Sequence, residues 1–199
     1  TELEEEDMQT IQRFASVFEQ TYTRFLDLKK AELQAREAIK QASLDRVRGQ
    51  IASMRTTDDL QRITPLIWKE LETLEVPFIR CGVFIVDDAR RQVNVYLTTP
   101  EGSPLGALHL PFDANDLTMQ TVDHWRSQKV YTRHWDRQAF IDWMQSMIEL
   151  RQVKKEEYQR GDAPPETLDL HFIPFSQGML YVGNTIPLEE EKIELVESL

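Results

Sequence analysis

The sequence predicts an α+β protein, with an antiparallel sheet of about five to six strands, helices on both faces of the sheet, and a long coiled-coil helix in front of it. Three observations lead to this prediction. Residues 1–55 contain no proline and a single glycine, Gly49, and are rich in good helix formers. Short β-branched and aromatic runs, separated by turn residues, recur after residue 78. Residues 113–161 interrupt these runs with apolar residues at helical spacing.

The first expected element is one helix from about Leu3 to about Met54. Apolar residues at alternating spacings of three and four mark the a and d positions of a coiled coil. This stripe, the predicted seam, comprises Met8, Ile11, Ala15, Phe18, Tyr22, Phe25, Leu44, Val47, Ile51 and Met54. It fades from Leu28 to Ser43, where charged side chains take most of the apolar places. Some fifty helical residues span about 75 Å, so we expect a partner helix: a parallel homodimer first, an intramolecular bundle second.

The two ends of the chain repeat one pattern. Leu3-Glu4-Glu5-Glu6 returns 185 residues later as Leu188-Glu189-Glu190-Glu191, and the apolar residues that follow keep the same offset. Chance is the alternative, because carboxylates commonly start helices. The matching spacing favours a tandem array cut from a longer protein. Residues 1–55 are then the exit helix of a preceding domain, 56–187 a globular domain, and 188–199 the start of its own exit helix.

The elements from residue 56 to 112 follow from local signals. Asp58 and Gln61 are spaced as a capping box before an amphipathic helix that ends before Pro77. Strands are expected at 79–86 and 92–99 around a turn at 87–90. A third strand, 105–112, follows the proline- and glycine-containing turn at 100–104.

The remaining elements are an insertion, two strands and a last helix. We expect a helix at 116–128 with Asp116 as its cap, a strand at 129–134, and a helix that Asp136 caps and that runs on until Gly161 and Pro164 stop it. Strands at 168–175 and 179–183 follow, and Pro187 opens the last helix.

Both faces of the sheet need cover. In the strand at 79–86, Cys81, Val83 and Ile85 alternate with Phe84 and Val86, so each face is apolar. The long helices can cover one face, which leaves the insertion, residues 113–161, for the other. A pocket between the insertion and the sheet is then the natural place for a ligand.

Composition excludes several classes of partner. The 199 residues carry a net charge of −11, which argues against nucleic acid and anionic membrane surfaces, since both are bound by basic faces. A single cysteine, Cys81, excludes an intrachain disulfide and a thiolate metal cluster and suits a reducing compartment. The longest run without charged residues, 170–188, is broken by prolines and glycines and is no transmembrane helix. The start TELEEEDMQT shows no signal peptide.

Several segments resemble GAF-type sensory domains. They are FASVFEQTYTRFLDLKKAELQAREA, ASLDRVRGQIASMRTTDDL, RCGVFIVDD, VYLTTPEG, FSQGMLYV and PLEEEK. They are similar in particular to GAF-like domains strung in series through long helices in bacterial sensor histidine kinases. The resemblance covers most of the chain and is stronger in the long helix than in residues 113–161. It implies a GAF fold, a cytoplasmic location, parallel dimerisation, and a role in passing a signal to a catalytic module elsewhere. The ligand or cofactor is not implied.

No catalytic motif is found, so no catalytic residue is expected. The four histidines lack close ligand spacing, and no metal site is expected. Polar strand residues and tryptophans of the insertion are the candidates for a ligand pocket, although packing or a solvated strand face explains each of them as well. These candidates are Tyr96, His109, Trp125, His134, Trp143 and His171.

Two functional interpretations remain open. The first is a non-catalytic sensory module that passes on a signal and binds a small molecule between the sheet and the insertion. The second is a structural dimerisation spacer with a vestigial, ligand-free core. A pocket of roughly 300 Å³ or more with convergent polar groups favours sensing, and a space filled by Trp and Met side chains favours the spacer.

Overall fold

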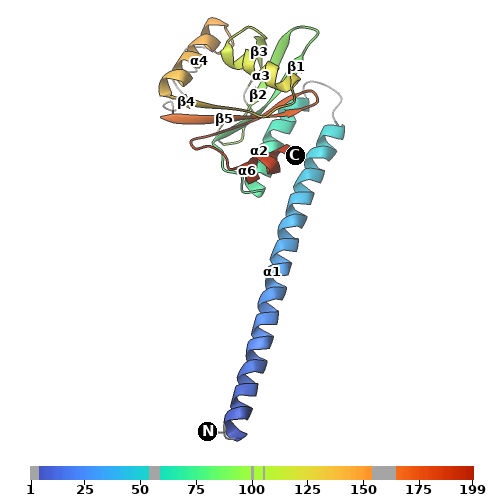
Figure 1. The fold of residues 1–199 in the computed structure, drawn as a ribbon. Coiled ribbons are helices and arrows are strands. Elements are labelled where there is room, and N and C mark those ends of the chain that lie inside the picture. The colour runs from blue at the N-terminus through green and yellow to red at the C-terminus, as the bar shows by residue number, and fades with distance from the viewer. Residues whose placement is uncertain (1–4, 54–58, 100, 105, 154–164) are drawn as a thin grey trace. The chain divides into compact units, whose positions relative to one another are not determined.

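The computed structural model describes residues 5–53, 59–99, 101–104, 106–153 and 165–199 (Figure 1). Its elements are α1 (Glu5–Ser53), α2 (Leu60–Thr73), β1 (Arg80–Asp87), β2 (Gln92–Leu97), β3 (Leu108–Pro111), α3 (Asp116–Arg126), β4 (Tyr131–Asp136), α4 (Arg137–Glu149), β5 (Thr167–Phe175), β6 (Gly178–Asn184) and α6 (Glu190–Glu197). The predicted α+β class and element order are confirmed. The chain divides into two compact units, Thr1–Ala42 and Ser43–Leu199.

The described part of the first unit is a single stretch of α1. Apolar side chains stand exposed along it, with Phe18 71% and Tyr22 53% accessible. The rings of Phe18 and Tyr22 stack on each other with their centroids 6.1 Å apart, and Tyr22 and Phe25 follow at 6.5 Å. No helix within the described residues is both long enough and apolar enough to cross a membrane.

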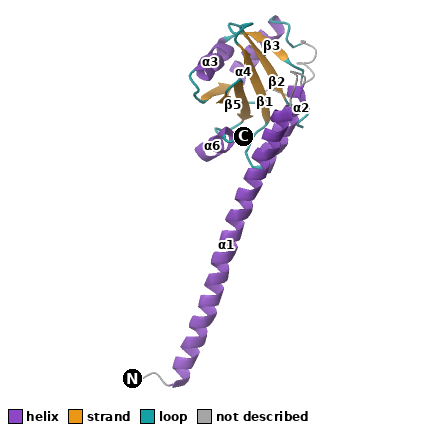
Figure 2. Cartoon of the chain, turned by 90° about the vertical axis from the view of Figure 1, so that its right-hand side faces the viewer, coloured by secondary structure: helices purple, strands orange, loops and turns teal. Residues whose placement is uncertain are grey.

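The second unit is built on a curled antiparallel sheet (Figure 2). Its six strands follow the order β3-β2-β1-β6-β5-β4. The hairpin of β1 and β2 pairs Val83 with Tyr96, and that of β5 and β6 pairs His171 with Val182. Because β1 also pairs with β6, the two hairpins form one continuous surface, and β3 and β4 lie at its edges.

Each face of the sheet is covered by helices (Figure 1). On one face α2 and α6 pack in what we call the connector-side core, whose buried residues are Ile63, Ile67, Leu71, Leu74, Val76, Cys81, Val83, Ile173, Leu180, Val182, Leu188 and Val196. Cys81 and Val83 therefore face α2 and α6, while Phe84 faces the opposite side. The prediction that both faces of this strand are apolar and covered is confirmed.

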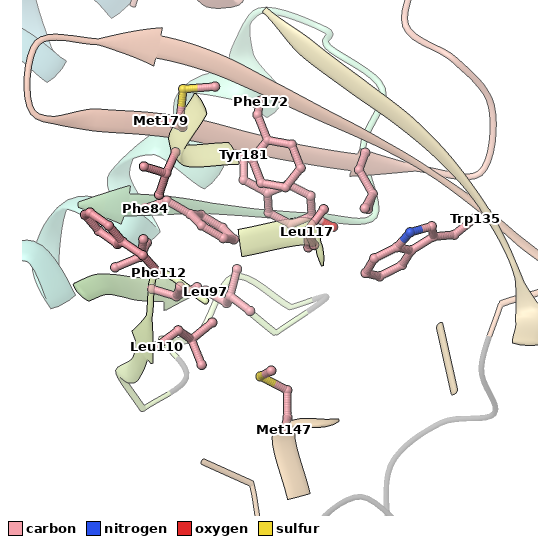
Figure 3. Close-up of a cluster of buried hydrophobic side chains, with 14 of the residues drawn as sticks. Phe84, Leu97, Leu110, Phe112, Leu117, Trp135, Met147, Phe172, Met179 and Tyr181 are labelled. Atoms are coloured by element: carbon pink, nitrogen blue, oxygen red, sulfur yellow. The ribbon is translucent and has the colours of Figure 1, made fainter. Parts of the chain in front are cut away.

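The insertion covers the other face and forms the insertion-side core (Figure 3). Its buried residues are Phe84, Val93, Val95, Leu97, Leu110, Phe112, Leu117, Val122, Trp135, Met147, Leu168, Leu170, Phe172, Met179 and Tyr181. Phe84, Phe172 and Tyr181 form an aromatic group with ring centroids 5.1–5.9 Å apart. Position 183 must be glycine for Tyr181 to fit this group, because a Cβ on Gly183 would lie 2.2 Å from the Tyr181 hydroxyl.

Three helices end in the same way, and this corrects one predicted boundary. α4 ends at Glu149, not near Gly161 as expected. Arg151 has a positive φ of 57°, its N–H donates to Ile148 O, and the Gln152 N–H donates to Met147 O. This is a Schellman motif, which usually carries glycine at the left-handed position. Glu75 and Gln128 hold the same position after α2 and α3.

The starts of the helices bring further corrections. The cap of α3 is Asn115, whose side chain accepts from the Thr118 N–H, and not Asp116. The predicted cap of α4 is confirmed, since Asp136 accepts from the Ala139 N–H. α6 begins at Glu190 rather than at Pro187. The predicted capping box lies outside the described residues at Asp58.

Candidate functional site

The predicted pocket between the insertion and the sheet is occupied by side chains. Among the described residues, Trp135, Met147, Phe172 and Tyr181 are all buried there and belong to one cluster (Figure 3). Burial raises the pKa of the Tyr181 hydroxyl. The insertion therefore packs on this face through large apolar groups.

Trp125 and Trp143 lie on this insertion side and are half-buried against its core. Trp125 Nε1 donates to the Phe175 carbonyl at 3.0 Å, which fastens α3 to the end of β5. Trp143 packs on Trp135 at 5.8 Å, and its Nε1 has no hydrogen-bond partner within the described residues. Both tryptophans thus contribute to the packing of the insertion.

Tyr96 and His109 lie on the connector side, where they line an open hollow of about 900 Å³ over the β1–β2 hairpin. Its polar groups bond one another. Asn94 Oδ1 accepts from Gln92 Nε2 at 2.8 Å and lies 2.7 Å from His109 Nδ1. This hollow lies across the sheet from the insertion.

His134 lies near the β4 edge and is largely exposed. Its Nδ1 is 3.0 Å from Oδ1 of the buried Asp169 on β5. Within the described residues, no three His, Cys, Asp or Glu side chains are grouped so that they could hold a metal ion. His134 and Asp169 therefore form a pair at the rim of the connector side.

His171 is the most buried of the candidates, with 2% of its surface exposed. Its Nδ1 lies 3.3 Å from Val182 O, and its Nε2 accepts from the Leu188 N–H at 3.0 Å. Burial lowers its pKa, while the Val182 carbonyl and Asp169 act in the opposite direction. The ring connects the middle of β5 to the segment that leads into α6.

The six candidate residues are thus divided between two faces of the sheet. Tyr96, His109, His134 and His171 alternate with core residues of the insertion side and lie on the connector side. The two tryptophans lie on the other. In the described structure, these six side chains do not line one common pocket.

Within the second unit, an ion pair that was not predicted from the sequence joins the end of α1 to α2. The Arg46 guanidinium forms two hydrogen bonds to the Glu70 carboxylate of α2, Nε to Oε1 at 2.7 Å and Nη2 to Oε2 at 2.6 Å. Arg46 Nη2 also donates to Ser43 Oγ at 3.1 Å. Arg46 holds the pKa of Glu70 below its usual value, although burial acts against this. One signal was available: Glu70 falls on the apolar stripe of its helix, next to Leu71.

Helix α6 attaches to the same side of the sheet. Val196 is buried in the connector-side core, and Ile193, Leu195 and Leu199 pack against it. Lys192 Nζ donates to the Leu74 carbonyl at the end of α2, at 3.4 Å. Both flanking helices, the end of α1 and α6, are therefore joined to α2.

The predicted seam is divided by the structure. Met8, Ile11, Ala15, Phe18, Tyr22 and Phe25 are exposed along α1. Leu44 and Val47 are 6% and 2% exposed, because the end of α1 packs within the second unit. These two positions of the predicted dimer seam are thus covered by the chain itself. The Ile51 side chain and Met54 lie outside the described residues.

Cys81 is fully buried on β1. Burial raises the pKa of its thiol to about 12, although a hydrogen bond with Thr98 opposes the shift. A thiol of this kind stays protonated and is a poor nucleophile.

Comparison of the chain with known protein families, with curated proteins and with solved structures finds no match.

Proposed function

We propose that this chain is a non-catalytic, signal-transmitting GAF-like module of a multidomain bacterial signalling protein, such as a cytoplasmic sensor histidine kinase. It dimerises in parallel through α1. The curled antiparallel sheet with a helical insertion is compatible with the GAF-like fold that the sequence segments resemble.

The observation that carries this proposal is the attachment of both flanking helices to α2. The end of α1 is held by the paired side chains of Arg46 and Glu70, while α6 contacts the end of α2 through Lys192 and shares its core. The Glu70 side chain is 1% exposed, and a buried carboxylate needs its partner. A displacement of α1 therefore changes the packing of α2. Because α2 and α6 pack in the same core, the change reaches α6.

Because side chains occupy the insertion-side core, we expect the signal to arrive through α1 rather than from a bound ligand. A buried core resists rearrangement, because a ligand that enters it must displace packed side chains. Trp135 and Met147 take the place between insertion and sheet where the sequence had suggested a small molecule. The same observation supports a second candidate function, a dimerisation spacer that passes on no signal.

Dimerisation is supported by the exposed aromatic side chains of α1. Phe18, Tyr22 and Phe25 lie at a and d positions and are at least half exposed. A continuous apolar stripe on a helix is stable in water when a second helix covers it. A second copy of the chain offers an identical stripe.

The two candidate functions, a signal-transmitting module and a passive spacer, are distinguished by weakening the contact between Arg46 and Glu70 and measuring hydrogen exchange in α6. Glu70→Gln keeps the shape of the side chain and removes its charge. If the module transmits, hydrogen exchange in Glu190–Glu197 rises about fivefold or more, the effect of a coupling free energy of about 1 kcal/mol. Exchange in β5 should stay unchanged. Mass spectrometry of peptides from the 199-residue chain measures both.

The matched control is Arg90→Gln, which removes a charged partner from the exposed Asp87–Arg90 pair in the β1–β2 turn. It should leave α6 exchange at the wild-type rate. Unchanged α6 exchange in Glu70→Gln as well would reject transmission and favour the spacer.

A further inference from the structure

His171 occupies an unusual place in the connector-side core. The ring is buried in the middle of β5, between β6 and Leu188. Leu188 is itself 7% exposed and belongs to the same core. It lies two residues before α6, whose N-cap is Glu189. One side chain thus connects the sheet to the start of the exit helix.

The two hydrogen bonds of the ring fix its protonation state. A backbone carbonyl only accepts, so Nδ1 must carry the hydrogen that it donates to Val182 O. A backbone N–H only donates, so Nε2 must offer its lone pair to Leu188. Only the neutral ring with its hydrogen on Nδ1 satisfies both partners. A hydrogen on Nε2 would bring two donors, the ring Nε2–H and the Leu188 N–H, face to face with no acceptor between them.

Among the described residues, Asp169 is the charged group that acts on the ring. Asp169 lies two residues away on the same face of β5 and is paired with His134 of β4. On this face β6 presents Val182 and Asn184, which do not titrate, and Cys81 follows on β1. α6 contributes Glu190, Glu191 and Lys192 in its first turn. Asp169 is the group that favours a charged ring, and it already has a partner in His134.

We propose that His171 is a proton-sensitive latch on the exit helix. The neutral ring holds Leu188 and thereby keeps α6 on the sheet. Protonation of Nε2 breaks the bond to Leu188 and releases the start of α6, while the two hairpins of the sheet stay paired.

The direction of the pH dependence follows from burial. Burial lowers the pKa of the latched ring, whereas a released ring returns to the ordinary value of about 6.5. The released state therefore binds the proton first as the pH falls. The latch is complete above about pH 6.5 and weakens as the pH falls through that value toward the lower pKa of the latched ring.

Hydrogen exchange between pH 8 and pH 5, corrected for the intrinsic effect of pH, tests this latch. Exchange at Leu188 and in the first turn of α6 should rise by up to about tenfold per pH unit below about pH 6.5. His171→Gln, whose amide can accept from Leu188 and donate to Val182 without titrating, should abolish this dependence. The control His109→Gln changes an exposed histidine on β3, which three strands separate from β5, and should keep the wild-type profile.

Two results would overturn the latch. One is a His171→Gln chain that keeps the wild-type pH dependence. The other is simultaneous loss of protection in β5, β6 and α6, which signifies unfolding of the domain rather than release of the helix.

If the glutamine variant does not fold, nuclear magnetic resonance of the wild-type ring nitrogens decides the matter. The latch requires the neutral Nδ1–H form above the transition and a ring titration midpoint that coincides with the exchange midpoint of α6. A hydrogen on Nε2, or a ring that titrates without α6 release, contradicts it. Release of α6 is measured within one chain, so this test can fail while the dimer and the transmission from α1 both hold.

Discussion

Cys81 shows how a single buried residue is constrained by its neighbours. Its Sγ lies 3.6 Å from Thr98 Oγ1, and the rest of its surroundings are the apolar side chains of the connector-side core. We expect Cys81→Ser to lower the free energy of unfolding by about 1 kcal/mol, because a hydroxyl costs more to bury than a thiol. Urea unfolding measures this change.

The reactivity of the same thiol gives a second readout. A thiol that is fully buried and has a raised pKa should react with a thiol reagent only when the domain opens. The wild-type chain unfolded in urea is the control and should react fast. Rapid labelling of the native protein would contradict the placement of Cys81.

The candidate residues illustrate what strand alternation can and cannot predict. It correctly indicated that Cys81 and Val83 face away from Phe84, because successive side chains of a strand point to opposite faces. It did not indicate that His171 would meet Leu188, since that contact depends on where the chain returns after β6. The Arg46–Glu70 pair joins two helices 24 residues apart, and no local rule brings them together.

At the scale of elements, the helix ends were the least predictable feature. Glycine and proline were expected to stop α4, but Arg151 takes the left-handed position there. Arginine at this position does not indicate a helix end in the sequence. It is tolerated there because the hydrogen bonds of the Schellman motif offset the cost of a positive φ. The long apolar and helical runs, in contrast, were located within a few residues, since their periodicity extends over many positions.

Glu75 provides a direct test of this helix-end interpretation. It follows α2 with a φ of 54° and an exposed side chain. Glu75→Gly should raise the free energy of unfolding by about 0.5–1 kcal/mol, because glycine adopts this conformation without steric cost.

Glu72 is the matched control, since it is exposed within the last turn of the same helix. Glu72→Gly should lower stability by about 0.5–1 kcal/mol, because glycine is a poor helix former. Thermal or urea unfolding of the two variants side by side measures both. Equal signs for the two changes would show that Glu75 is not strained.

At the scale of the whole molecule, the two units differ in what covers their apolar surface. The second unit has two cores of buried apolar side chains, one on each face of the sheet. The first unit leaves Met8, Phe18 and Tyr22 exposed on α1. The sequence predicted this stripe from its spacing alone. It could not indicate that the stripe stops before Leu44, because that depends on packing between α1 and the domain that follows.

The proposed parallel dimer along this stripe holds the two copies of α1 in register, as a module that passes a signal between helices requires. Oxidative cross-linking of single-cysteine additions tests it most directly. Met8→Cys and Tyr22→Cys lie two heptads apart at a positions, so each should form a disulfide with its counterpart in the second copy. Gln20→Cys, on the outward side of the same helix, is the control and should not cross-link.

Denaturing gel electrophoresis without reductant, run on each variant of the 199-residue chain, separates the outcomes. We expect a cross-linked dimer for both Met8→Cys and Tyr22→Cys and a monomer for Gln20→Cys. Cross-linking at only one of the two seam positions would indicate antiparallel helices. A monomer in all three variants would show that neither seam position meets its counterpart in a second copy, and either result would contradict the parallel dimer.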